Sequence, residues 1–309
     1  MRTAFITTLL ELATADPKIT LLTGDLGYGV LEPFAKDRPK QFINLGVAEQ
    51  NLMGFAAGLA LEGRTPICYS IATFLTLRAF EQVRNDICYQ NLNVKLVGVG
   101  SGLTYSQYGA THHSMEDIGL MRLLPNMTVL APGDPHEVTA ATRAMLQHRG
   151  PCYLRIASRG EPQVHAQPPA FAIGRGIVIR EGTDAAIIAT GNLLQNAALA
   201  TQQLAAQGIN VRLISMPSIK PLDVTLVTET AQRFTHVFTV EEHSEIGGLG
   251  SAVASVIAQL PHRACQLHLI AGSDAFQPVG GWLPYLRDRN GLTPEKIAER
   301  VLNIVKRKT

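Results

Sequence analysis

The feature that most constrains this chain is a regular alternation of apolar, strand-like segments with helix-like segments. In the first half, the expected strands lie at 19–23, 41–45, 66–71, 94–99, 127–131 and 152–157. The expected helices lie at 3–14, 47–61 and 75–90, with two more beginning at a capping-box-like Ser114-Met-Glu-Asp117 and at Asp134-Pro135. Strands that are apolar throughout are typical of a parallel sheet covered by helices on both faces.

A second and smaller alternation follows a polar, proline-rich stretch at 158–172. Its expected strands lie near 175–180, 185–190, 209–214, 235–240 and 265–270, and its helices near 193–207, 223–233, 249–260 and 294–306. A chain of 309 residues has room for two ordinary domains. We therefore expect an α/β protein of two doubly wound domains, at 1–160 and 173–309, joined by a linker at 161–172.

Composition and charge argue against several classes of protein. The net charge of +2 implies neither nucleic-acid binding nor strong attraction to a membrane surface. No apolar run approaches the length needed to span a membrane, and the N-terminal segment has no suitable signal-peptide cleavage site. The four cysteines are scattered without metal-ligand spacing, which favours buried thiols in a reducing compartment. We expect a cytoplasmic protein with no metal ligands of its own.

The stretch at 42–63 raises a chemical question. It predicts a short strand and then a helix at 47–61 that is apolar on nearly every side, with Gly54 and Gly58 allowing close packing. A helix hydrophobic all round is expected to be buried. Glu49 nevertheless lies in its first turn, on the apolar stripe, where a carboxylate is unfavourable unless something compensates it. Either Glu49 is a helix-start residue with its head in solvent, or its burial serves a function.

Four short motifs lie at the expected carboxyl ends of strands, where open α/β sheets bind ligands. They are GDL at 24–26, GVAEQN at 46–51, ATF at 72–74 and GATHHSMED at 109–117. In this order and spacing they resemble the pyrimidine-binding domain of the transketolase family of thiamine-diphosphate enzymes. The later stretches IIATGNLLQNA, LISMPSIKPLD, TVEEH with GGLGS, and GSDAFQPVG resemble that family's C-terminal domain. The resemblance covers nearly the whole chain.

The resemblance implies thiamine diphosphate as cofactor. Glu49 would be the carboxylate that contacts the N1′ nitrogen of the aminopyrimidine and drives it into the imino form, which requires a dry site and a rigid helix. Phe74 would stack on the pyrimidine, the alternative being core packing at a strand end. Asp25 and Leu26 would lie near the cofactor, although Asp25 also suits a simple turn.

The resemblance also assigns substrate contacts. His112 matches a histidine that hydrogen-bonds the substrate carbonyl or hydroxyl, a role that suits imidazole because its charge changes near neutrality. His113 stands where many relatives have glutamine. Arg2 and Arg159 resemble phosphate-contacting arginines, with solvated surface cations as the alternative. Tyr108 stands where sugar-phosphate enzymes usually carry an aspartate.

Other departures weaken the expected phosphate clamp. Gly100 and Ser101 occupy positions that supply a phosphate-binding histidine or arginine in relatives, and Gly29 replaces a serine. The loop instead offers neutral hydrogen-bonding and aromatic side chains, namely Tyr105, Ser106, Gln107 and Tyr108. These predict an acceptor that is uncharged near its reacting end, and therefore ketol transfer to or from an atypical carbohydrate.

One part of the family's site is missing. Its Mg²⁺ and diphosphate are held by a Gly-Asp-Gly motif and a later Asn, which provide the oxygen ligands that Mg²⁺ requires. The only Gly-Asp pairs here precede Leu26 and Pro135. The chain therefore resembles the smaller subunit of a split transketolase. We expect a partner subunit that carries the diphosphate and Mg²⁺ site, and a homodimer of this chain within an α2β2 heterotetramer.

Two other functions stay open at this point. The β subunit of a 2-oxoacid or acetoin dehydrogenase shares the two-domain plan, and a non-catalytic regulatory subunit is also compatible with the fold. Retention of both Glu49 and His112 argues against the second. The glycines at 247–250 open a helix, where they suit either a phosphate loop or, more simply, a tight turn.

Overall fold

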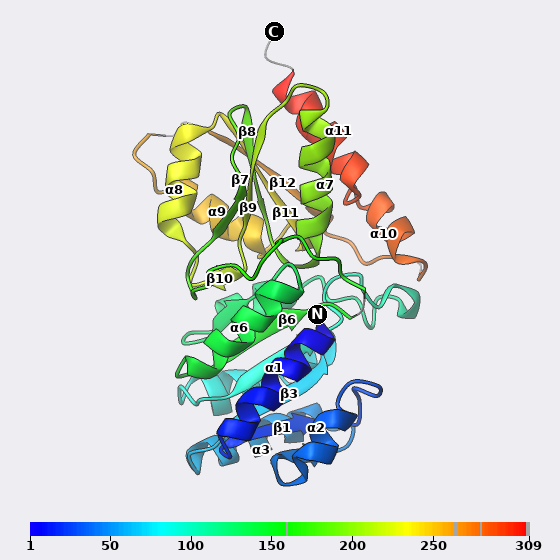
Figure 1. The fold of residues 1–309 in the computed structure, drawn as a ribbon, viewed down its shortest axis with the longest axis vertical. Helices are drawn as coiled ribbons and strands as arrows, with labels where there is room; N and C mark the ends of the chain where they lie inside the picture. Colours follow the sequence, from blue (N-terminus) through cyan, green and yellow to red (C-terminus); the bar gives the residue numbers. More distant parts are fainter. Residues whose placement is uncertain (159, 263–264, 279, 307–309) are drawn as a thin grey trace.

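The computed structural model describes residues 1–158, 160–262, 265–278 and 280–306. A seven-stranded and a five-stranded sheet are stacked along the long axis of the molecule (Figure 1). Helices cover both faces of each sheet, and the strands within each sheet are mostly parallel. The predicted class, two α/β domains built on parallel sheets, is therefore confirmed.

The first sheet has the strand order β10-β5-β6-β4-β3-β1-β2. Its parallel strands are β1 (Ile19–Thr23), β2 (Phe42–Asn44), β3 (Thr65–Ile71), β4 (Lys95–Val99), β5 (Thr128–Leu130) and β6 (Cys152–Ile156). The edge strand β10 (Ser218–Lys220) comes from the second half of the chain and pairs antiparallel with β5. No strand was predicted there, so this exchange between the two halves is a finding of the structure.

The helices of the first half lie on the two faces of this sheet. They are α1 (Arg2–Ala15), α2 (Glu32–Asp37), α3 (Glu49–Leu61), α4 (Phe80–Gln82), α5 (Asp117–Leu123) and α6 (Pro135–Gln147), with short 3₁₀ turns η1 (Pro39–Gln41) and η4 (Ser106–Tyr108). On one face α1 packs against α6, and on the other α3 packs against β3 and the segment at 74–88. The predicted cap of α6 is confirmed, because the Asp134 carboxylate accepts a 2.8 Å bond from the Glu137 N–H and Pro135 follows it.

Three local predictions were wrong. The segment predicted as one α-helix at 75–90 contains two wide π-helical turns, η2 (Phe74–Arg78) and η3 (Val83–Cys88), on either side of α4. Such turns are common at functional sites. The capping box at Ser114 is absent, because the Ser114 backbone bridges to Gly102 and the Asp117 side chain binds Arg155 instead. Helix α5 accordingly begins at Asp117.

The third correction concerns α3, which is not buried on all sides. Leu52, Met53, Ala56 and Ala57 are buried, but the opposite face, with Gly54, Phe55, Gly58 and Leu61, is exposed. A methyl group added at Gly54 or Gly58 would meet nothing within 4 Å. An apolar helix with one uncovered face, here two glycines with Phe55 and Leu61, is a candidate contact surface for another protein chain.

The second sheet has the order β12-β11-β8-β9-β7, with β7 antiparallel to β9. Its strands are β7 (Ile177–Arg180), β8 (Ala185–Ala189), β9 (Val211–Ser215), β11 (His236–Ser244) and β12 (Gln266–Gly272). Its helices are α7 (Leu194–Ala205), α8 (Val224–Arg233), α9 (Leu249–Ile257), α10 (Leu283–Arg289) and α11 (Pro294–Val305), with a 3₁₀ turn η5 (Gly191–Leu193). Helices α7 and α11 pack together on one face, and α8 and α9 on the other (Figure 1).

Strand β11 runs four residues further than predicted, through Glu241, Glu242 and His243 to Ser244. All four cysteines are free thiols, and Cys265 is the one that is not fully buried. In the described part of the chain, no helix combines the length and apolarity needed to cross a membrane.

Candidate active site

Glu49 opens α3 as a buried carboxylate, with 1% of its surface exposed. Its Oε2 atom accepts a 2.7 Å hydrogen bond from Nη1 of Arg78, whose side chain is half exposed. The other oxygen, Oε1, lies near Gly24 at the carboxyl end of β1, where an added Cβ would be 4.0 Å away. This burial excludes a helix-start carboxylate with its head in solvent.

Phe74 lies beside Glu49 at the carboxyl end of β3. The guanidinium carbon of Arg78 is 4.8 Å from the centroid of the Phe74 ring, and the same guanidinium donates to Glu49. The Phe74 ring is only partly buried, so it is not a simple core side chain. Sequence reasoning missed Arg78, although its place four residues after Phe74 puts the two on one helical face.

His112 joins this group from the loop that follows β4. Its ring centroid lies 5.1 Å from that of Phe74 and 5.0 Å from that of Tyr108, and Thr111 Oγ1 is 2.9 Å from Nδ1. Partial burial, and then the neighbouring His113, lower the pKa of His112 below its usual value. The imidazole is therefore largely neutral at pH 7 and suited to exchanging a proton or a hydrogen bond with a bound oxygen.

His113 points into the protein, although it follows His112 directly. It is buried, and its Nε2 lies 3.1 Å from the Ser106 carbonyl oxygen, so the ring supports the η4 turn. The structure brings Glu49, Phe74 and His112 together and leaves His113 behind the loop. Two adjacent histidines cannot be told apart by sequence alone, because only the path of the loop decides which one faces outward.

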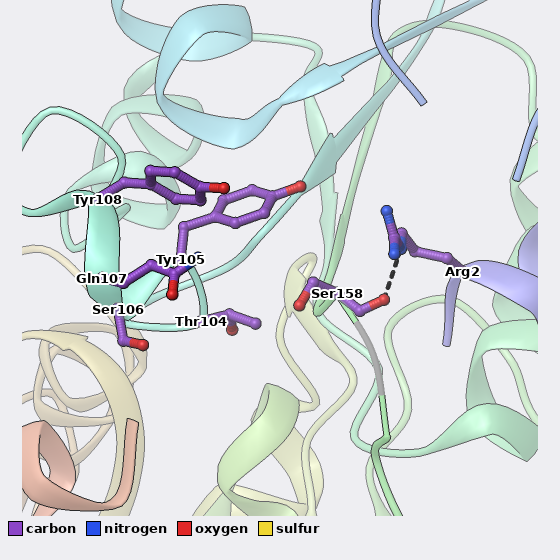
Figure 2. Close-up of a pocket in the computed structure, with 7 residues that line it drawn as sticks. All are labelled: Arg2, Thr104, Tyr105, Ser106, Gln107, Tyr108 and Ser158. Carbon is purple, nitrogen blue, oxygen red and sulfur yellow. Dashed lines mark hydrogen bonds between the residues drawn. The ribbon is translucent and has the colours of Figure 1, made fainter. Parts of the chain in front are cut away.

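A cavity of about 460 Å³ lies beside this loop (Figure 2). It is lined by Arg2, Thr104, Tyr105, Ser106, Gln107, Tyr108 and Ser158. The Tyr108 side chain is 57% exposed, and its ring centroid is 6.0 Å from that of Tyr105. Arg2 lies across the cavity, where its Nε donates a 2.5 Å bond to the Ser158 carbonyl oxygen. Arg159, the second predicted arginine, lies outside the described residues.

Asp25 and Leu26 line a second, smaller cavity of about 180 Å³ at the end of β1. The Asp25 carboxylate accepts hydrogen bonds from Asn44 Nδ2 at 2.9 Å and from the Tyr28 hydroxyl at 3.0 Å, and these bonds lower its pKa. Asn44 was not predicted. Its Oδ1 also accepts from the N–H groups of Asp25 and Gly46, so it links the β1 turn to the entry of α3.

Within the described residues, no group of three or more His, Cys, Asp or Glu side chains is arranged to hold a metal ion. The site thus presents a buried carboxylate, an aromatic ring, a neutral imidazole and one arginine-containing cavity.

Both halves of the chain match models of known protein families. Residues 1–161 match the model of the transketolase pyrimidine-binding domain, and residues 174–297 match that of the transketolase C-terminal domain.

Several curated proteins are similar to this chain over most of its length. A 6-deoxy-6-sulfo-D-fructose transketolase subunit of Clostridium sp. strain MSTE9 is 36% identical over 100% of this chain and 95% of its own. One of the apulose-4-phosphate transketolase subunits of Phocaeicola vulgatus is 37% identical over 84% of each chain. A 1-deoxy-D-xylulose-5-phosphate synthase of Chlorobium luteolum is 37% identical over 95% of this chain, which spans only 46% of the synthase.

Solved structures give the same result. A split-gene transketolase, described as an inactive beta4 tetramer, superimposes with a TM-score of 0.91 at 39% identity, over 100% of this chain and 99% of that one. A transketolase from Pichia stipitis gives a TM-score of 0.81 at 20% identity, with 99% of this chain covering 45% of that enzyme, a likeness of fold.

Proposed function

The chain belongs to the transketolase family, and we propose that it is the pyrimidine-binding catalytic subunit of a two-subunit, thiamine-diphosphate-dependent enzyme that transfers a two-carbon ketol unit between carbohydrates. The observation that carries this proposal is the buried Glu49 carboxylate beside the partly exposed Phe74 ring. A regulatory subunit has no need of an ionisable group in that place. The relatives that match over nearly their full length are transketolase subunits, which agrees with this function.

The chemistry of the donor set fits the aminopyrimidine of thiamine diphosphate. The Arg78 guanidinium, a planar group rich in N–H donors, already lies over Phe74 and donates to Glu49. An aminopyrimidine protonated at N1′ offers the same two features, a plane for Phe74 and a donor for Glu49. Phe74 and Glu49 would therefore hold the ring, with Asp25 and Leu26 nearby. When bound, the cofactor supplies the nucleophilic carbon that takes up the ketol unit.

His112 and the cavity loop would act on the carbohydrate. The neutral His112 imidazole, beside Phe74, is placed to hydrogen-bond a substrate carbonyl or hydroxyl and to move its proton. Tyr108 and Arg2 line the adjoining cavity, and His113 supports it from behind.

The acceptor is an atypical carbohydrate that is uncharged near its reacting end. Among the residues that the structure describes, the cavity is lined by Arg2 and by neutral side chains, namely Thr104, Tyr105, Ser106, Gln107, Tyr108 and Ser158. Each lost hydrogen bond to a charged group weakens binding by about 1.5–3 kcal/mol. An ordinary phosphorylated acceptor should therefore bind this enzyme about a hundredfold more weakly than it binds a relative that keeps all its phosphate-binding side chains. Two similar proteins are named for unusual sugars, a sulfofructose and apulose 4-phosphate.

A partner subunit would supply the diphosphate and Mg²⁺ ligands, because the Gly-Asp-Gly and Asn motif is absent from the sequence. The uncovered face of α3, with Gly54, Phe55, Gly58 and Leu61, would join two copies of this chain within an α2β2 heterotetramer in the cytoplasm. The split-gene neighbour is itself described as a tetramer of β chains.

Steady-state kinetics of the reconstituted complex test this function. We expect ketol transfer that requires both subunits, with xylulose 5-phosphate and ribose 5-phosphate used at a kcat/KM below about 10⁴ M⁻¹s⁻¹, the low end for dedicated enzymes. A higher value would identify an ordinary transketolase. Oxidative decarboxylation of a 2-oxoacid, without ketol transfer, would identify a dehydrogenase β subunit. This chain alone serves as the control and should turn over neither substrate.

A further inference from the structure

The loop that lines the larger cavity is held in place from the second domain. The carboxylate of Glu242, near the end of β11, accepts a 2.7 Å hydrogen bond at Oε1 from the Leu103 N–H. The same oxygen accepts a 2.9 Å bond from Asn192 Nδ2, and Asn192 Nδ2 also lies 3.2 Å from Thr104 Oγ1. A single carboxylate thus reaches the first residues of the loop both directly and through Asn192.

The base of the loop lies next to the Glu242 carboxylate. Gly102 and Ser114 exchange backbone hydrogen bonds of 3.1 and 2.8 Å, which close the loop at its base. Nη2 of the buried Arg155 donates to the Ser114 carbonyl oxygen at 2.9 Å and to that of Glu242 at 2.8 Å. A Cβ on Gly102, whose φ is +60°, would lie 2.5 Å from Glu242 Oε1, so the carboxylate approaches closely because this residue is glycine.

The opposite side of the loop is braced by the segment that leads into α10. The Gly281 N–H donates to the Ser106 carbonyl oxygen at 3.1 Å, and α10 contacts the η4 turn (Figure 1). Arg287 of α10 then returns to the same carboxylate, with 2.5 Å between its Nε and Glu242 Oε2. Glu242 therefore links the base of the loop to the helix that supports its tip.

Glu242 is an unusual residue to find in this position. It is 0% exposed, whereas Arg287 keeps 16% of its side chain in solvent. A buried charged pair contributes little net stability compared with apolar residues of the same shape, and in some proteins such groups instead specify one conformation. Here the hydrogen bonds of the carboxylate lead to Leu103 of the loop, to Asn192, which bonds to Thr104, and to Arg287 of α10, a helix that contacts the η4 turn.

We propose that Glu242 is a positioning residue of the second domain, which fixes the loop at 102–108 and thereby the distance between its tyrosines and Arg2 across the acceptor cavity (Figure 2). Glu242 does not line the cavity and acts through Leu103 and Asn192. The expected effect of Glu242 on acceptor binding rests on the proposed function, whereas its expected effect on the loop does not.

The first test measures the loop itself. Hydrogen–deuterium exchange is followed by mass spectrometry in the isolated chain, comparing the wild type with Glu242→Gln. Glu241→Gln is a matched control, because Glu241 is the preceding residue and equally buried, but its oxygens accept from the N–H groups of Leu249 and Gly250 at the start of α9. We expect exchange at 102–113 to speed up about tenfold in Glu242→Gln and to stay at the wild-type rate in Glu241→Gln.

The second test measures the acceptor in the reconstituted complex. Glu242→Gln should raise the acceptor KM about tenfold, the equivalent of one weakened hydrogen bond, with kcat and the donor KM within about twofold of wild type. Glu241→Gln should leave all three constants at wild-type values. If the wild-type complex shows no ketol transfer, the proposed function fails, while the exchange experiment still decides the role of Glu242.

Several outcomes would overturn the proposal. Equal loosening of the loop in both variants would mean a general loss of stability, and an unchanged loop in Glu242→Gln would mean that the carboxylate does not position it. Faster exchange in the loop of Glu242→Gln with an unchanged acceptor KM would show that Glu242 does not affect acceptor binding in the cavity. Arg287→Lys, at a partly exposed site, guards against misfolding of the buried variant and should shift exchange in the same direction by about threefold.

Discussion

The two sheets use their carboxyl edges in opposite ways. In the first sheet, the segments that follow β1 to β4 carry Asp25, Glu49, Phe74 and His112. Asp25 lines one cavity, and His112 lies beside Tyr108, which lines the other. In the second, the ends of β8 and β11 carry Thr190, Glu241, Glu242 and His243, all buried. Thr190 Oγ1 donates to the Ala131 carbonyl oxygen at 3.1 Å, and the Gly119 N–H donates to His243 Nε2 at 3.2 Å. The edge that we propose binds a small ligand in one domain contacts the neighbouring domain in the other.

This contrast separates fold from function. The rule that open α/β sheets bind ligands at their carboxyl edge applies equally to both sheets. At the second edge, the carboxylates of Glu241 and Glu242 accept hydrogen bonds from groups within the protein. The two buried carboxylates differ in their partners: Glu49 accepts at Oε2 from the half-exposed Arg78 side chain, whereas both oxygens of Glu241 accept from backbone N–H groups at the start of α9. Glu49 is therefore the stronger candidate for binding a ligand.

The largest expected effect is at Glu49. Glu49→Gln keeps the shape of the side chain but removes its charge, so turnover of the complex should fall at least about a hundredfold. The fold should remain, as judged by circular dichroism and the thermal midpoint. Proton exchange at C2 of bound thiamine diphosphate, followed by NMR, checks the cause, and exchange at the wild-type rate would refute the assigned role.

Glu241→Gln should behave in the opposite way. Weakening its bonds to the Leu249 and Gly250 N–H groups, 2.6 and 2.7 Å long, should lower the free energy of unfolding by about 1–3 kcal/mol. Turnover per folded complex should stay at the wild-type level. Urea denaturation alongside the activity assay measures both, and a loss of turnover with full stability would mean that the second edge also takes part in chemistry.

A smaller effect is expected at Arg78. In Arg78→Ala the guanidinium no longer covers Phe74, so thiamine diphosphate should bind the complex up to about fivefold more tightly, since a half-exposed ion pair is worth at most about 1 kcal/mol. Titration calorimetry gives the affinity, with Arg84→Ala, an exposed arginine, as control. Weaker binding would show instead that Arg78 holds Glu49 in its working position.

The smallest effect is expected at the end of β5, where linker residues contact the carboxyl edge of the first sheet. The Asp134 carboxylate accepts from the N–H groups of Val164 and His165, and His165 Nε2 lies 2.7 Å from Glu137 Oε1. Burial opposes the charged imidazole, but the hydrogen bond and charge of Glu137, helped by Asp134, outweigh it and raise the pKa of His165.

A raised pKa in the folded state means that this contact stabilises fully below the unfolded value of about 6.5 and is lost as the pH rises through the folded value. Wild type should therefore lose more unfolding free energy between about pH 6 and pH 8 than His165→Gln, as measured by urea denaturation. The same pH dependence of the unfolding free energy in both proteins would show that the His165–Glu137 contact does not stabilise the fold through the linker.

The main architecture was predictable from the sequence, and so was the residue at the centre of the candidate site, whose role stays a prediction. Apolar strands alternating with helices indicate covered parallel sheets, and a carboxylate on an apolar helix stripe singles out Glu49. Long-range contacts were not predictable. Strand β10 has three residues, and its pairing with β5 is set by distant segments. In the same way, Glu242 approaches Leu103 only once Gly102 and the second domain are in place.

The position of β10 also bears on how separable the two halves are. The chain crosses to the second sheet, sends Ser218–Lys220 back to the edge of the first, and returns to complete the second. A single protease cut at 161–172 would leave two fragments still joined by strand pairing along β5. A truncated first half would expose the β5 edge, with its unpaired backbone groups free to recruit a strand from another molecule. Recombination between relatives at the linker would likewise exchange a catalytic-domain edge strand along with the second domain.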